Sequence, residues 1–397
     1  MTAQNTTSRP GVRRWLTTPW LVVPIVLPVL VLVVWILLQR SHAYFLDLEV
    51  YRIGVHTWLA GGDMYGPLPP TAVGRELPFI YPPFAAIVLT PLVLLPWNAA
   101  WVTLFALSLA SIAVTLYVVA RSVWPAGEVP GAVALATMAL PLALVLEPVR
   151  GTFEFGQINL ILMGLVAADC LVRRPRWPRG LLIGLAAAIK LTPAAFVLFF
   201  LLRRDPRAAV VAVVTAVAAT VLGFIVDPAS SLRYWSNGPA AGVSGSEFYT
   251  NQTLMAVLTR AGFGEGVAKA VWLVLAAAVL ALVVPVVRRA EPALALVALA
   301  GCALLLSPTS WSHHYVWIAP AVLVAGVQAV RTRSPGWTVT SVGLVVAFAL
   351  APFRFLPGDG GRELGWTGPQ QLVGATYVIV VAGLLALLWW RQRRVLA

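Results

Sequence analysis

An aspartate on the aromatic face of a short amphipathic segment is the first candidate for chemistry. At the helical period of about 100° per residue, Glu49, Arg52 and His56 share one polar stripe. Asp47 falls on the opposite face, together with Tyr51. A carboxyl group half-buried among apolar groups can have a raised pKa, which suits a general base. The alternative interpretation is that Asp47 only caps the helix.

A lysine interrupts one long apolar segment. Residues 181–202 are apolar apart from Lys190, and Pro193 follows at a position that breaks a helix. Ionisable residues at membrane depth usually mark functional sites, and a cation at a helix break suits a phosphate or an anionic headgroup. The alternative is a lysine that reaches the membrane surface along its aliphatic chain.

Further polar residues gather where one apolar run ends and the next begins. They are Glu147, Arg150, Glu154, Gln157 and Asn159. Gln157 and Asn159 stand inside the start of an apolar run, where polar side chains usually face the interior of a helix bundle. They either contribute to a polar site or hydrogen-bond neighbouring helices.

Two adjacent histidines, His313 and His314, lie between two apolar runs. No cysteine and no histidine at i,i+4 accompanies them, so no metal site is expected. We favour hydrogen bonding to a phosphate or a sugar, and aromatic anchoring at the membrane surface is the alternative.

Two other segments combine polar and aromatic side chains. Asn251 and Gln252 follow a loop rich in glycine, serine and aromatic residues, a composition that suits sugar binding. Tyr81 opens a rigid Tyr-Pro-Pro-Phe turn, which either contacts a substrate or lipid or begins a helix at the membrane surface.

The composition places all these residues in a membrane protein. The chain has 397 residues, of which 60% are hydrophobic and 11% charged, whereas soluble domains carry about a quarter charged residues. This balance excludes an ordinary soluble domain, a disordered chain and a disulfide scaffold. The formal net charge of +13 indicates topology and not a nucleic-acid partner, because cytoplasmic loops of membrane proteins collect Lys and Arg.

Apolar runs of roughly the 20 residues that a membrane-spanning helix needs occur repeatedly. They lie at 19–38, 99–120, 131–147, 156–172, 207–226, 267–287, 292–306, 315–330, 337–352 and 370–390. Arginine clusters at 173–179 and 203–207 flank the segment that contains Lys190. Both clusters are cytoplasmic only if residues 181–202 form two short helices that meet at Lys190.

This topology predicts an all-helical protein with twelve transmembrane helices and both termini inside. Residues 80–96 then form an outer juxtamembrane segment. We divide the chain into a cytoplasmic tail (1–18), a module with a first outer loop at 39–98 (19–226), a second outer loop (227–266) and C-terminal helices that complete the site (267–397). Because the long loops lie outside, we expect the chemistry there. No nucleotide-binding motif is visible, and an outward-facing enzyme cannot draw on cytosolic nucleotide sugars, so its donor substrate would be lipid-linked.

An ordered set of motifs resembles a known family. Asp47-Leu-Glu-Val-Tyr51, YPPF, GQxN, KLTP, Asn251-Gln252 and SPxSWxHH occur in this order along residues 47–314. Together they resemble the bacterial integral-membrane GT-C-type glycosyltransferases that use polyprenyl-phosphate sugars. Within that family they are most similar to the mycobacterial α-1,2-mannosyltransferases of phosphatidylinositol mannoside synthesis.

The resemblance implies a GT-C fold in the bacterial plasma membrane and a role for each candidate residue. Asp47 would deprotonate the 2-hydroxyl of a mannose on the acceptor glycolipid, and inversion at β-mannosyl phosphate would give an α-1,2 linkage. Lys190, His313 and His314, and less directly Arg52 and Tyr51, would bind the donor phosphate or sugar. The acceptor or the polar part of the site would involve Tyr81, Arg150, Glu154, Gln157, Asn159, Asn251 and Gln252. No metal and no cofactor besides the polyprenyl-phosphate-mannose donor is implied.

Two other functions remain as alternatives. The same fold could transfer another lipid-linked sugar such as arabinofuranose. A transporter or lipid flippase is less favoured. Transporters often have paired broken helices in two inverted halves, whereas this sequence shows one broken helix with no matching partner in the other half.

Overall fold

The computed structural model describes residues 19–41, 45–237 and 246–396. The predicted tail at 1–18 and part of the predicted outer loop at 227–266 lie outside these ranges. The first half comprises α2 (Pro19–Ser41), α3 (Leu46–Leu59), α4 (Pro83–Leu94), α5 (Trp97–Val123), α6 (Glu128–Val145), α7 (Glu147–Phe155), α8 (Asn159–Leu171), α9 (Leu181–Ile189), α10 (Val197–Leu202), α11 (Pro206–Val226) and α12 (Pro228–Asn237).

The second half is also helical. It comprises α13 (Leu254–Arg260), α14 (Glu265–Arg289), α15 (Pro292–Leu306), α16 (Ile318–Thr332), α17 (Pro335–Leu350), α18 (Gly368–Gly374) and α19 (Thr376–Leu396). Short 3-10 helices include η2 (Thr192–Phe196), η4 (Ser312–Trp317) and η5 (Pro352–Phe355). Within the described ranges, extended pairing is limited to an isolated antiparallel bridge between Asn251 and Trp311.

Seven helical stretches of the described chain are long and apolar enough to cross a membrane. They are Trp20–Gln39, Trp97–Val123, Pro125–Val145, Pro206–Val226, Glu265–Arg289, Ser312–Thr332 and Pro335–Phe355. Helices α18 and α19, bent by 67°, would together form an eighth. Shorter apolar helices lie at Pro83–Leu94, Asn159–Leu171, Thr192–Leu202 and Pro292–Leu306. The all-helical, multi-pass class is therefore confirmed, while the total of twelve spans and the division into domains stay predictions.

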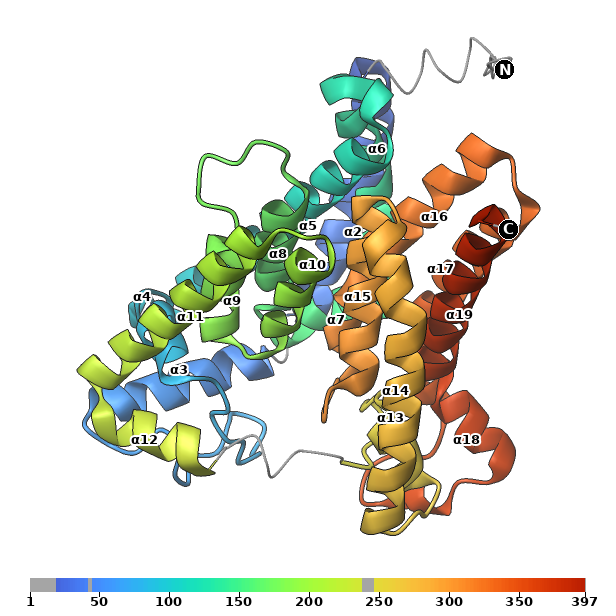
Figure 1. Ribbon diagram of the computed structural model, residues 1–397. Coiled ribbons are helices and arrows are strands. Elements are labelled where there is room, and N and C mark those ends of the chain that lie inside the picture. The colour runs from blue at the N-terminus through green and yellow to red at the C-terminus, as the bar shows by residue number, and fades with distance from the viewer. Residues whose placement is uncertain (1–18, 42–44, 238–245, 397) are drawn as a thin grey trace.

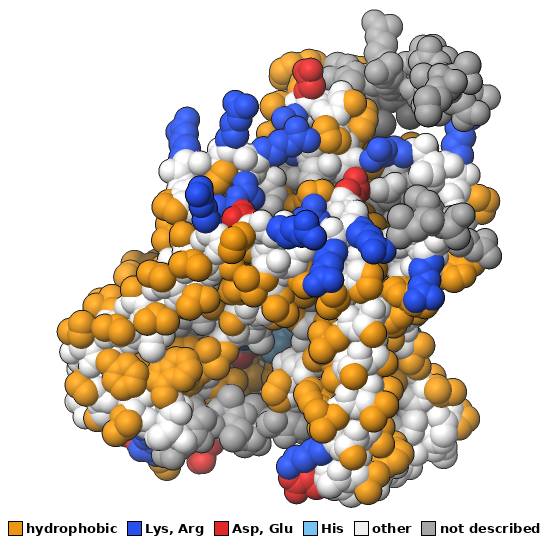
Figure 2. Space-filling model, in the orientation of Figure 1, with side chains coloured by type: hydrophobic (Ala, Val, Ile, Leu, Met, Phe, Trp, Pro, Cys, Tyr) orange, Lys and Arg blue, Asp and Glu red, His pale blue; other side chains and the backbone are white. Residues whose placement is uncertain are grey.

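The segment around Lys190 is broken as expected. Helix α9 ends at Ile189, Lys190 has extended backbone angles, and the chain resumes as η2 and α10. Arg179 donates to the carbonyls of Asp169 and Cys170 at the end of α8, and Arg203 donates to the carbonyls of Val287 and Ala290 at the end of α14. Figure 2 shows Lys and Arg side chains concentrated at one end of the molecule.

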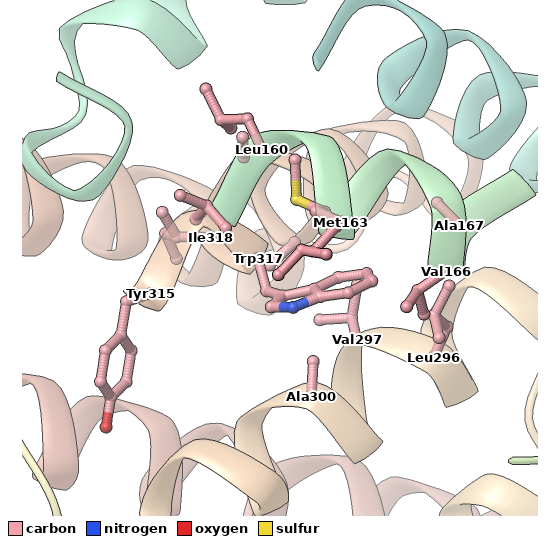
Figure 3. Packing of buried hydrophobic residues seen from close by; sticks show 14 of the residues in the cluster. Leu160, Met163, Val166, Ala167, Leu296, Val297, Ala300, Tyr315, Trp317 and Ile318 are labelled. Atoms are coloured by element: carbon pink, nitrogen blue, oxygen red, sulfur yellow. The ribbon is translucent and has the colours of Figure 1, made fainter. Parts of the chain in front are cut away.

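The two halves meet along a buried seam. In Figure 1 α3, α4, α9, α11 and α12 lie on one side and α13, α14, α18 and α19 on the other, with α5, α8 and α15 between them. Leu160 and Met163 of α8 pack in one cluster with Val297 of α15 and Trp317 of η4 (Figure 3). Away from the basic end, a hollow opens between the halves, and histidine is visible in its depth (Figure 2).

Candidate active site

Asp47 lies in the first turn of α3 and is half-buried. The cap position of this helix belongs to Phe45, which makes no side-chain capping bond, so helix capping does not account for the aspartate. Burial raises the pKa of Asp47 to about 6, against the opposing effects of the Lys190 charge and a hydrogen bond from Gln157. A carboxylate with this pKa is ionised at neutral pH and is basic enough to accept a proton from a hydroxyl group.

Lys190 brings three site elements together from the end of α9. Its Nζ donates to Oδ1 of Asn159 at 2.9 Å and lies 3.4 Å from Nε2 of His314. The same Nζ stands 5.5 Å from the centre of the Tyr81 ring, a distance typical of cation–π contacts. Lys190 and His314 are partly exposed. The break in the apolar segment therefore places a cation beside the Asp47 carboxylate.

The turn between α7 and α8 supplies the amide side chains. Gly156 has a φ of 68°, and a Cβ there would lie 2.9 Å from Cβ of Leu48. Since a left-handed residue without a side chain is needed at this contact, Gly156 allows α3 to approach Gln157. The Oε1 atom of Gln157 accepts from the hydroxyl groups of Tyr51 at 2.9 Å and Tyr81 at 3.2 Å.

The two histidines are held through the backbone of η4. The carbonyl oxygen of His313 accepts from Oγ1 of Thr152 at 3.0 Å and from Nδ2 of Asn159 at 3.1 Å. The His313 and His314 rings meet edge to face, with centres 4.9 Å apart. Nε2 of His313 is buried and has no hydrogen-bond partner within the described part of the chain. Such an orphaned polar atom is costly unless a ligand or water satisfies it.

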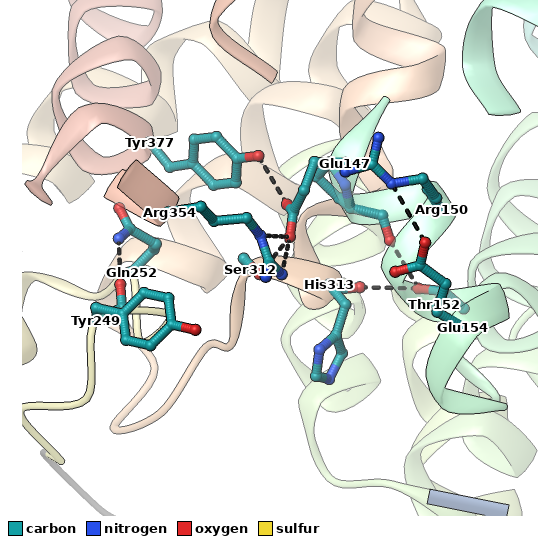
Figure 4. Close-up of polar contacts among 11 residues, drawn as sticks. Glu147, Arg150, Thr152, Glu154, Tyr249, Gln252, Ser312, His313, Arg354 and Tyr377 are labelled. Atoms are coloured by element: carbon teal, nitrogen blue, oxygen red, sulfur yellow. Dashed lines mark hydrogen bonds and ion pairs between the residues drawn. The ribbon is translucent and has the colours of Figure 1, made fainter. Parts of the chain in front are cut away.

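A second buried network, centred on Glu147, locks η4 in place (Figure 4). The Glu147 carboxylate is 1% exposed. It accepts from Oγ of Ser312 at 2.8 Å, from Nε of Arg354 at 2.8 Å and from the hydroxyl of Tyr377 at 2.7 Å. Sequence reasoning singled out Glu147 but missed Arg354 and Tyr377, which lie more than 200 residues further along the chain.

Several predicted site residues have other partners. Arg52 donates to the carbonyl of Leu95 at 2.8 Å, at the end of α4, and not toward the Lys190 cluster. Arg150 and Glu154 form a partly exposed ion pair at 3.4 Å. The structure therefore does not bring Arg52 to the Asp47 carboxylate.

Asn251 and Gln252 brace the outer loop. Oδ1 of Asn251 accepts from the backbone N–H of Ser310 at 3.1 Å, and Nε2 of Gln252 donates to the carbonyl of Gly374 at 2.8 Å. Both side chains are fully buried, and they tie the loop to the chain just before η4 through Asn251 and to the end of α18 through Gln252. In the ranges that the structure describes, no three His, Cys, Asp or Glu side chains gather as metal ligands do.

Comparison with known proteins identifies the family of the chain. The model of glycosyltransferase family 87 matches residues 79–308. A protein of Mycolicibacterium smegmatis, named polyprenol-phosphate-mannose-dependent α-(1-2)-phosphatidylinositol mannoside mannosyltransferase, is 40% identical over 89% of this chain and 86% of its own length. Its counterpart from Mycobacterium tuberculosis is 39% identical over 86% of this chain and 85% of its own length.

More distant similarities extend over almost the whole chain. A Mycobacterium tuberculosis protein named for the phosphatidylinositol pentamannoside reaction is 31% identical over 97% of this chain and 91% of its own length. The crystal structure of ArnT from Cupriavidus metallidurans bound to undecaprenyl phosphate is 16% identical, covering 92% of this chain and 77% of ArnT with a TM-score of 0.46. On the strength of the matched family model and the closer relatives, the chain belongs to glycosyltransferase family 87.

Proposed function

We propose that this glycosyltransferase moves mannose from polyprenol-phosphate-mannose to a 2-hydroxyl of a mannosylated phosphatidylinositol, forming an α-1,2 linkage. The names of the relatives that are 39–40% identical support this donor and acceptor. The observation that carries the proposal is a basic carboxylate, Asp47, beside a cation and a histidine, Lys190 and His314, at a half-open site.

Asp47 acts as the general base. Its carboxylate accepts the proton of the acceptor 2-hydroxyl while that oxygen bonds to the anomeric carbon of the donor. The bond between this carbon and the phosphate oxygen breaks on the opposite face, and its electron pair leaves with the polyprenyl phosphate. Attack from the opposite face converts a β-linked donor into an α-linked product.

Lys190 and His314 stabilise the leaving phosphate. Charge develops on the phosphate oxygen as the bond breaks, and preorganised cations and N–H donors aimed at such a position usually supply the largest catalytic effect. Lys190 is held by Asn159 at 2.9 Å, so its ammonium group is already placed. Nε2 of His313, which has no hydrogen-bond partner among the described residues, offers one further polar atom beside the His314 ring.

The site faces the outside of the bacterial plasma membrane, with both termini in the cytoplasm. The concentration of Lys and Arg at the opposite end of the molecule (Figure 2) supports this orientation, because positively charged loops remain cytoplasmic. Lipid-linked donor and glycolipid acceptor then both approach from the membrane.

The test is reconstituted transfer with defined substrates. Purified protein in liposomes receives polyprenyl-phosphate-mannose or polyprenyl-phosphate-arabinofuranose, together with phosphatidylinositol mannosides carrying different numbers of mannoses, and products are identified by mass spectrometry. We expect mannose transfer that Asp47→Asn reduces by about 10²–10⁴-fold, the usual contribution of a general base. Asp63→Asn, at the exposed ion pair with Arg233, is the matched control.

Two results would contradict the proposal. Transfer of arabinofuranose in preference to mannose would replace the donor. Turnover by the Asp47→Asn protein equal to that of the Asp63→Asn protein would remove Asp47 as the base.

A further inference from the structure

Three buried polar side chains form a closed group directly behind Asp47. Tyr51, Tyr81 and Gln157 are 0%, 5% and 4% exposed. The two hydroxyl oxygens lie 2.9 Å apart, and both are within hydrogen-bond distance of Oε1 of Gln157, at 2.9 and 3.2 Å. A polar group of this kind is expensive to bury unless its members hydrogen-bond to one another, as these three side chains do.

The proton count in this group restricts the Gln157 amide. Each phenol has one proton, and a phenol–phenol bond can use only one of the two, so a hydroxyl proton remains for Oε1 of Gln157, which lies within hydrogen-bond distance of both phenols. Oε1 therefore faces the phenols and the NH₂ group faces away from them. The opposite amide orientation would aim an oxygen at the Asp47 carboxylate, which only accepts hydrogen bonds when ionised.

The backbone of Gln157 is also fixed. Its N–H donates to the carbonyl of Thr152 at 2.9 Å, in the turn that the left-handed Gly156 closes. With its backbone anchored and its oxygen held by two phenols, the amide has one remaining donor group. That group is available to the neighbouring Asp47 carboxylate, whose pKa the Gln157 side chain lowers.

We propose that Tyr51 and Tyr81 are positioning residues that hold the Gln157 carboxamide with its NH₂ group toward the Asp47 carboxylate, so that this carboxylate stays ionised and correctly aimed. The proposal rests on Asp47 being the base of the proposed function. Under this proposal Tyr51, Tyr81 and Gln157 act on Asp47, and they do so without contacting the donor or the acceptor.

The charged and titratable groups near Asp47 are consistent with this role. Lys190 faces it from the end of α9, Tyr51 from its own helix and Tyr81 from the turn before α4. Burial, together with the neighbouring Asp47 carboxylate, raises the pKa of both phenols, so they remain protonated donors throughout the working pH range. Lys190 thus supplies the charge that favours the ionised carboxylate, and Gln157 supplies a directed hydrogen bond.

The experiment follows the pH dependence of kcat/KM for mannosyl transfer, which reports the pKa of the base in the free enzyme. For the wild type we expect an acid limb near the pKa of Asp47, about 6. Without both hydroxyl groups the amide can turn its oxygen to a protonated Asp47. The Tyr51→Phe/Tyr81→Phe protein should therefore have its acid limb raised by about one pH unit, the effect of one hydrogen bond on a carboxylate.

Three further variants separate positioning from stability. Gln157→Leu should raise the acid limb by the same amount, and adding both Phe substitutions to it should give no further shift, because residues that act through one group are not additive. The single variants Tyr51→Phe and Tyr81→Phe each leave one hydroxyl on Oε1 and should shift the limb less. Tyr65→Phe is the matched control, since its hydroxyl donates to the backbone carbonyl of Tyr81 at 2.8 Å and not to Gln157.

The results distinguish this proposal from the proposed function. If the double Phe protein and the Tyr65→Phe protein both keep the wild-type profile while Asp47→Asn is inactive, the base stands and the positioning role is wrong. The positioning role would also be wrong if the two Phe substitutions raised the acid limb further in the Gln157→Leu protein. If Asp47→Asn retains turnover, the assignment of the base fails first, whatever the phenols do.

Discussion

Removal of the Glu147 carboxylate should destabilise the protein more than any loss of a surface ion pair. The carboxylate is 1% exposed and accepts hydrogen bonds from Ser312, Arg354 and Tyr377. Each neutral hydroxyl left without this acceptor costs about 1 kcal/mol, and a charged donor about 1.5–3 kcal/mol. The Arg354 side chain is 31% exposed, so water recovers part of its loss. We expect Glu147→Ala to lower the free energy of unfolding by about 4 kcal/mol.

The assay is thermal unfolding of the purified protein in detergent, followed by intrinsic tryptophan fluorescence. For a chain of this length, a loss of about 4 kcal/mol corresponds to a fall of about 5 °C in the midpoint temperature. Ser312→Ala removes one of the hydrogen bonds and should cost about 1 kcal/mol. Glu265→Ala breaks an exposed i,i+4 pair with Lys269 and should leave the midpoint unchanged. A Glu147→Ala midpoint no lower than that of Ser312→Ala would refute the reasoning, because the arginine would then not need its partner.

Two further predictions concern the site and the turn that shapes it. Lys190→Met, which keeps the length of the side chain and removes its charge, should weaken binding of polyprenyl phosphate measured by calorimetry at least tenfold, and unchanged affinity would remove Lys190 from the phosphate site. Gly156→Ala should destabilise the protein by about 1–3 kcal/mol and reduce transfer, because its φ of 68° is combined with a Cβ position 2.9 Å from Leu48. The control Gly61→Ala has a φ of 79° but nothing within 4 Å of its Cβ, so it should retain full activity; equal losses in the two variants would show that backbone strain alone is responsible.

The parts of the site that the sequence predicts are those encoded locally. Lys190 and Pro193 lie three residues apart in an apolar segment, so the helix break could be inferred without any tertiary contact. The helical period likewise separated Asp47 from the stripe of Glu49 and Arg52. The first prediction rests on the effect of proline on the helix backbone, and the second on the direction of side chains around a helix. Both can be read from neighbouring residues.

The parts that could not be predicted depend on contacts between distant elements. No local pattern shows that Arg52 reaches the carbonyl of Leu95 at the end of α4. Arg354 meets Glu147 across 207 residues of chain. The anchoring of His313 is made by its carbonyl oxygen, and backbone contacts leave no signature in residue type.

The interruption at Lys190 also has a consequence for biogenesis. Joined into one straight helix, residues 181–202 would be roughly 33 Å long, enough to cross a hydrocarbon core of ~30 Å. In the proposed topology, which places both arginine clusters in the cytoplasm, Arg203, Arg204 and Arg207 would then be translocated, and every later segment would insert with the opposite orientation. Under that topology, substitutions at Pro193 should be judged first by the orientation of the inserted chain, because a continuous helix over residues 181–202 would change the number of crossings by one.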